Sequence, residues 1–133
     1  MSYYSEVGVK IYSPVGYTAD KIWEAYTKAV VAKGGSAAFV EKLFTKHIVG
    51  NMLVLHVDGV KWYDGDPCVE GMREILNGIQ ELSEELGGGY HFMRIGEQYD
   101  DVEEHICGDV DNYINCVRYI DLNMEGDFDA RIC

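Results

Sequence analysis

The most informative segment of this 133-residue chain is YHFMRIGEQYDDVEEHI, residues 90–106. Its first part, residues 91–95, has the apolar content of a β-strand, and residues 98–101 are typical of a turn. Alternation along residues 102–107 puts Val102, Glu104 and Ile106 on one face and Glu103 and His105 on the other. This second segment is too polar for the centre of a sheet. We therefore predict an edge strand, where charge discourages pairing with other chains.

The residues before this segment alternate between strand and helix patterns. Residues 6–12 predict a strand with one buried face, and residues 18–33 change to a helical period that ends at a glycine pair. Ser36 is suited to cap a short second helix. Two further strands are predicted at residues 47–49 and 52–57, joined by a tight turn, and the second is apolar enough to lie inside the sheet.

A long helix is predicted to run from Pro67 to about Leu86. Asp66 is suited to the N-cap and Pro67 to the first helical position, while residues 87–89 are three glycines that stop the helix. Gly71 and Gly78 lie seven residues apart on one face of this helix. Each costs about 1 kcal/mol relative to alanine. We therefore expect both to allow close approach of a neighbouring backbone.

The order strand, helix, strand, strand, helix, strand predicts a single α+β domain spanning residues 1–133. Its expected form is a ferredoxin-like split βαβ sheet with the helices on one face. An acidic C-terminal extension adds two strands, at residues 102–107 and 115–122. Residues 123–133 lack periodicity, and we expect them to fray.

The charge of the chain is unevenly distributed. The formal net charge is −12, and residues 95–133 alone carry 11 acidic and 2 basic side chains. Such a field repels nucleic acid and anionic membranes, and it favours basic proteins or cations as partners. Solubility alone is the other explanation for the acidic composition.

Targeting and cysteine patterns indicate a cytoplasmic protein. The four cysteines, at positions 68, 107, 116 and 133, fit neither a zinc-binding nor a CxxC spacing. Residues 2–6 are polar where a signal peptide would be apolar, and no apolar stretch is long enough to span a membrane. We expect reduced thiols in the cytoplasm.

No segment carries a catalytic or cofactor signature, so we expect no cofactor and no enzymatic activity. The acids at residues 100–104 could gather a divalent cation. Alternation along the strand opposes this, because Glu104 should point away from Asp101 and Glu103. Asp109 and Asp111 lack the glycine and glutamate that would complete a calcium loop.

Three segments carry a resemblance to a known group of proteins. They are SYYSEV at residues 2–7, KWY at residues 61–63 and FMRIGEQYDDVE at residues 92–103. Together they resemble a loose group of small acidic proteins encoded by bacteriophages and prophages. The resemblance implies a viral accessory protein made in the host cytoplasm, where such proteins often bind and redirect a host protein. It implies no catalytic or cofactor-binding residue.

We predict a non-enzymatic interaction protein whose acidic surface binds a basic host or phage protein, in one version as a nucleic-acid mimic. Aromatic side chains beside acids would anchor the interface. The expected partner-binding residues are Trp62, Tyr99, Asp100, Asp101, Glu103, Glu104, Asp109 and Asp111. One alternative is a small metal-dependent hydrolase or nucleotide-binding enzyme that uses the same acids. Another is a structural module that dimerises through its aromatic face.

Overall fold

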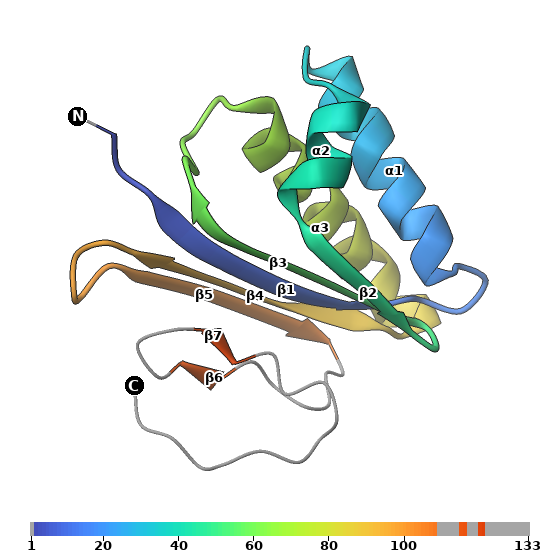
Figure 1. The fold of residues 1–133 in the computed structure, drawn as a ribbon. Coiled ribbons are helices and arrows are strands. Elements are labelled where there is room, and N and C mark those ends of the chain that lie inside the picture. Colours follow the sequence, from blue (N-terminus) through green and yellow to red (C-terminus); the bar gives the residue numbers. More distant parts are fainter. Residues whose placement is uncertain (1, 109–114, 117–119, 122–133) are drawn as a thin grey trace.

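The computed structural model describes residues 2–108, 115–116 and 120–121, and it confirms the α+β class. Three helices cover one face of a five-stranded antiparallel sheet (Figure 1). The elements in chain order are β1 (Ser5–Tyr12), α1 (Ala19–Ala32), α2 (Ala37–Leu43), β2 (Thr45–Val49), β3 (Met52–Val60), α3 (Pro67–Leu86), β4 (Gly89–Gly96), β5 (Val102–Gly108), β6 (Asn115–Cys116) and β7 (Ile120–Asp121). None of the described helices is both long enough and apolar enough to cross a membrane.

The strand order in the main sheet is β2-β3-β1-β4-β5. The N-terminal strand β1 lies in the centre and pairs along its whole length with β4, from Ser5 opposite Gly96 to Tyr12 opposite Gly89. Its other neighbour is β3, which is an inner strand as predicted. The predicted edge position of β5 is also confirmed, and β2 forms the opposite edge.

Local sequence signals account for the helix boundaries. The side chain of Ser36 accepts a hydrogen bond from the backbone N–H of Phe39, and Asp66 accepts one from Cys68. These are the capping interactions expected at helix starts, and both predicted N-caps are confirmed. At the other end of α3, Gly87 has a φ of 72°, a left-handed conformation that ends a helix with little strain.

A row of aromatic rings crosses the core between the helices and the sheet. It starts at Trp23 on α1 and passes through Tyr26, Phe44 and Trp62 to Phe92 on β4, with ring centroids 5.8 to 6.3 Å apart. Such edge and tilted contacts add to the apolar burial of each ring. The row therefore connects α1 to the β5 edge of the sheet, where the last rings line a cavity.

The C-terminal prediction of one strand at residues 115–122 is wrong. Asn115 pairs with Asp121 and Cys116 with Ile120, so the chain reverses between two short antiparallel strands. β7 comes close to β1, which is already paired on both edges, so β7 must approach across a face of the sheet. Figure 1 shows β6 and β7 on the side opposite the helices. The predicted fraying of residues 123–133 lies outside the described residues.

The two glycines of α3 differ in their surroundings. A Cβ on Gly71 would lie 2.9 Å from Val30 Cγ2 and 3.3 Å from the Val30 backbone nitrogen, so α1 and α3 pack closely there, as expected. A Cβ on Gly78 would meet nothing within 4 Å. Close approach is therefore confirmed at Gly71, whereas the same expectation for Gly78 is wrong.

This difference predicts substitutions with opposite effects on stability. Gly78→Ala should raise the free energy of unfolding by up to about 1 kcal/mol, because alanine is the better helix former and the space is open. Gly71→Ala should lower it by about 1 to 2 kcal/mol, because the added methyl group overpacks α1 against α3. Urea unfolding of the two variants measures both values. Equal shifts in the two variants would contradict the packing at Gly71.

Candidate functional site

A cavity of about 260 Å³ lies between α3 and β5, at the edge of the sheet. We call it the α3–β5 groove. Its rim is polar: α3 supplies Arg73, Asn77 and Gln80, and the facing strand supplies Glu103 and His105. The three α3 residues share one side of the helix because their spacing of four and three follows the helical period. Glu103 and His105 share the helix-facing side of β5 because they are two residues apart.

The floor of the groove is apolar and aromatic. Trp62 and Phe92 lie there with their ring centroids 6.2 Å apart, and the His105 ring stacks on Phe92 at 6.0 Å. Tyr90 also lines the groove from β4, and its side chain is buried. An apolar floor with a few polar groups at the rim is the usual composition of a ligand-binding cavity.

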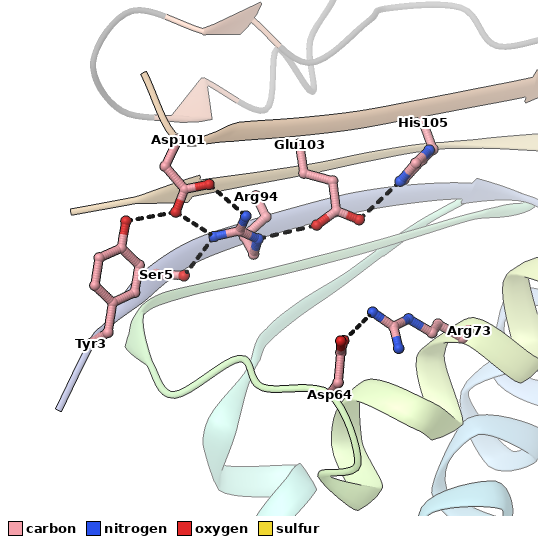
Figure 2. Close-up of polar contacts among 8 residues, drawn as sticks. All are labelled: Tyr3, Ser5, Asp64, Arg73, Arg94, Asp101, Glu103 and His105. Carbon is pink, nitrogen blue, oxygen red and sulfur yellow. Dashed lines mark hydrogen bonds and ion pairs between the residues drawn. The ribbon is translucent and has the colours of Figure 1, made fainter. Parts of the chain in front are cut away.

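A chain of ion pairs runs along the β5 side of the groove (Figure 2). The Arg94 guanidinium holds Asp101 through two bonds, 2.7 Å from Nη2 to Oδ1 and 3.1 Å from Nη1 to Oδ2. Arg94 Nε donates to Glu103 Oε1 at 3.2 Å, and Glu103 Oε2 lies 2.9 Å from His105 Nε2. The planar guanidinium thus joins the two carboxylates across the hairpin.

The N-terminal segment holds the Asp101 end of this row of ion pairs in place through hydrogen bonds. The Tyr3 hydroxyl donates to Asp101 Oδ2 at 2.6 Å, and Arg94 Nη1 donates to the hydroxyl of the buried Ser5 at 3.1 Å. A Cβ on Gly96 would fall on both the Asp101 carboxylate and the Tyr3 hydroxyl, so a larger residue there would have to displace their contact. β1 and the β4–β5 turn are therefore fixed to each other at this end of the sheet.

The ion-pair chain also sets the charge state of its acids. Hydrogen bonds from Arg94, and next from Tyr3, lower the pKa of Asp101 from 3.8 to about 2. For Glu103, burial acts to raise the pKa, but hydrogen bonds from His105 and Arg94 outweigh it and the pKa is lowered overall. Both carboxylates are thus held ionised, with their charge compensated inside the protein.

The predicted partner-binding residues that the structure describes do not all lie on one face of the sheet. Glu104 lies on the other face of the sheet from Glu103, as alternation predicts, and its Oε2 is 2.6 Å from Nε2 of the buried His91. Tyr99, which is 72% exposed, and Asp100 lie at the β4–β5 turn. Trp62 lies half-buried in the groove, whereas Asp109 and Asp111 fall outside the described residues.

Sequence reasoning missed a second acidic group. Glu81, Glu84 and Glu85 are exposed on the C-terminal part of α3, and within the described part of the chain they make no ion pair. A second hollow, lined by Asn77, Gln80, Glu81 and Glu84, adjoins the groove and shares its first two residues with it. The helical spacing of three and four residues was the available signal, because it places these acids on one side of α3.

The two parts of the sequence differ strongly in charge. Residues 1–61 contain seven lysines and five acids, whereas residues 62–133 contain four arginines and 18 acids. Of these arginines, Arg73 binds Asp64 and Glu70 on the α3 side, and Arg94 binds Asp101 and Glu103. The structure therefore uses both described arginines to compensate acids of the same region, and α3 keeps its last three carboxylates uncompensated.

Neither metal-ligand geometry nor similarity to known proteins assigns a role to the groove. Among the described residues, no group of three or more histidine, cysteine, aspartate or glutamate side chains is placed to hold a metal ion. The chain matches no protein-family model, no curated protein and no solved structure in the comparisons made.

Proposed function

We propose that this chain is a non-enzymatic binding protein that presents an acidic surface, centred on the end of α3, to a basic partner protein. The observation that carries this proposal is the placement of Glu81, Glu84 and Glu85. Like charges three and four residues apart on a helix repel each other. These acids also lie near the C-terminal end of α3, where the helix dipole is negative and the last turn has no basic residue.

These acids therefore carry two electrostatic penalties, repulsion from each other and repulsion from the negative end of the helix dipole. Two such penalties at one place are unusual for a surface selected only for stability. A lysine or arginine here would favour the helix on both counts. Departures from such local rules are expected at functional sites. A basic partner surface would relieve the repulsion, so these carboxylates favour association over isolation.

The proposal changes the roles first expected for the acids of the β4–β5 hairpin. Asp101 and Glu103 are bound by Arg94, and we assign them to holding the hairpin together. Asp100 and Tyr99 remain candidates at the β4–β5 turn. Glu104 lies on the opposite face of the sheet and is not part of the proposed surface.

We also infer a ferredoxin-like arrangement for the first part of the chain. The order β4-β1-β3-β2 supports it, with β5 added beside β4 and α2 inserted before β2. As for the partner, a protein with a nucleic-acid-binding surface would supply the required chemistry, because such surfaces are rich in lysine and arginine. A phage accessory protein acting on a host protein of this kind fits the proposal.

Affinity capture with two charge-matched variants tests the proposed function. The tagged chain is used to capture proteins from bacterial lysate at low and high salt, and the affinity of the purified partner is then measured. We expect one basic protein that is retained at low salt and released at high salt, because salt screens exposed charges. Glu81→Gln with Glu84→Gln should weaken its binding about fivefold.

The control removes the same amount of charge elsewhere. Asp20 and Asp58 are exposed and form no ion pair within the described residues, so Asp20→Asn with Asp58→Asn changes the net charge equally without touching α3. This control should bind as the unchanged protein does. Equal weakening by both variants would indicate a general charge effect and would refute a surface centred on α3.

A further inference from the structure

We propose that the α3–β5 groove takes an arginine side chain of the basic partner, with the guanidinium group placed against Trp62 and beside Glu103. This inference rests on the proposed function, and it adds the chemical group that the site recognises. Four features of the groove support it: an unpartnered buried hydroxyl, an aromatic floor, acceptor groups at the rim and an acidic surrounding.

The buried hydroxyl belongs to Tyr90. This side chain is only 7% exposed and lines the groove, and within the described part of the chain its hydroxyl makes no hydrogen bond. Native structures rarely keep a buried polar group without a partner. Burial raises the pKa of Tyr90, with a smaller contribution from Cys107, so the neutral hydroxyl is available to accept a hydrogen bond from a cationic donor.

The aromatic floor suits a flat cation. Trp62 is half-buried in the groove, and Phe92 lies next to it. A guanidinium group stacks on aromatic rings through its π-system and its charge, and it is more weakly hydrated than an ammonium group. The methylene stem of the same side chain would lie along Met72 and Leu76, which are buried and line the groove.

The rim supplies acceptors for the remaining N–H groups. Each Glu103 carboxylate oxygen accepts one bond, from Arg94 or from His105, and a carboxylate has about four acceptor sites in total. The side chains of Asn77 and Gln80 line the same space, and their amide oxygens can accept hydrogen bonds. Arginine has five donors in a fixed planar arrangement, so it matches several acceptors around an aromatic floor better than lysine does.

The charge around the groove favours a cation over an anion. Arg73 is the cationic group on the α3 rim, and it is held by Asp64 at 2.5 Å and Glu70 at 2.8 Å. Figure 2 shows Arg73 and Asp64 on the α3 side, apart from the ion pairs that Arg94 makes on the β5 side. Glu81 and Glu84 line the adjoining hollow. A phosphate-bearing ligand would meet net repulsion here, whereas a partner arginine would be attracted.

The test uses the full chain and three short peptides, acetyl-Gly-Arg-Gly-amide and its citrulline and lysine counterparts. Citrulline has the shape of arginine without its charge. Trp23 and Trp62 each give one indole N–H signal in a ¹⁵N-resolved NMR spectrum. We expect the arginine peptide to shift the Trp62 signal and to leave the Trp23 signal unchanged. The lysine peptide should bind more weakly than the arginine peptide, and the citrulline peptide should bind at least about tenfold more weakly.

Tyr90→Phe tests the site directly, because it removes only a hydroxyl that makes no hydrogen bond to the other described residues. The variant should remain folded, and its affinity for the arginine peptide should fall about fivefold. The matched control is Tyr17→Phe, which removes the hydroxyl of an exposed tyrosine that does not line the groove and should change nothing. A Trp62 signal that stays unmoved at high peptide concentration, or equal binding by Tyr90→Phe, would overturn the inference.

The outcomes of the two tests are distinguishable. If neutralising Glu81 and Glu84 releases a basic partner while the Trp62 signal does not respond to arginine, the proposed function stands and the groove inference fails. If the Trp62 signal responds but no basic protein is captured, the groove binds a guanidinium group and the proposed function fails.

Discussion

Arg94→Met is expected to lower the free energy of unfolding by about 3 kcal/mol. The side chain of Arg94 is only 15% exposed, and its loss leaves Asp101 and Glu103 without their shared cation and the buried Ser5 hydroxyl without its donor. The methionine keeps much of the apolar stem, so the loss reports mainly on the ion pairs. Urea unfolding at neutral pH measures it.

The same variant should change how the free energy of unfolding depends on pH. In the folded protein the pKa of Asp101 is about 2, below its usual value of 3.8. A lowered folded-state pKa contributes stability that is present above about pH 3.8 and is lost as the pH falls toward 2. In Arg94→Met the pKa of Asp101 should return toward its usual value. The free energy of unfolding should then no longer fall because of Asp101 as the pH is lowered through this range.

Arg73→Met is the control for both measurements. Arg73 also bridges two carboxylates, but its side chain is 49% exposed and that of Asp64 is 84% exposed. Exposed pairs contribute little, so we expect a loss below about 1 kcal/mol. Equal losses of unfolding free energy in the two arginine variants would contradict a special role for the ion pairs of Arg94.

Gly89→Val is expected to cost about 3 kcal/mol or more and to detach the end of β5. A Cβ at Gly89 would fall on the carbonyl oxygen of Cys107 and would lie 3.0 Å from the Cα of Gly108. Both contacts are with backbone atoms, which cannot move away as the tip of a side chain can. Because Gly89 pairs with Gly108, the change should release β5 and with it the β5 rim of the groove.

Hydrogen exchange of the β5 amides reads out this detachment separately from global unfolding. Gly16→Ala is the control, since a Cβ there meets nothing within 4 Å and only the positive φ of 90° opposes it. That backbone effect should cost about 1 to 2 kcal/mol and leave β5 protected. Normal protection of β5 in Gly89→Val would show that the pairing of β4 and β5 survives the added side chain, against the packing described here.

Most elements of the fold could be predicted because their signals are local. Ser36 and Asp66 lie where capping chemistry demands a side-chain acceptor, and the alternation of β5 placed Glu103 and Glu104 on opposite faces. The strand order required contacts between residues far apart in the chain, which no local pattern contains. The prediction of one strand over residues 115–122 failed for a related reason: no local pattern shows that Cys116 pairs with Ile120.

The candidate site was less predictable than the fold. Counting acids along residues 100–104 found charge, but not that Arg94, directly opposite Glu103 in the hairpin, compensates two of them. The groove forms only where α3 and β5 meet. The Tyr90 hydroxyl, which has no hydrogen-bond partner among the described residues, is likewise a property of the packed core, because a sequence shows a tyrosine but not whether its hydroxyl finds a partner.

The central position of β1 determines when folding can finish during synthesis. β1 leaves the ribosome before its neighbour β4, which is complete only at residue 96. Closing so large a loop is slow, and until then Val7, Val9 and Ile11 have no complete core to join. A nascent chain that stalls before β4 therefore carries an open, apolar strand edge, which is the feature that recruits other chains into aggregates.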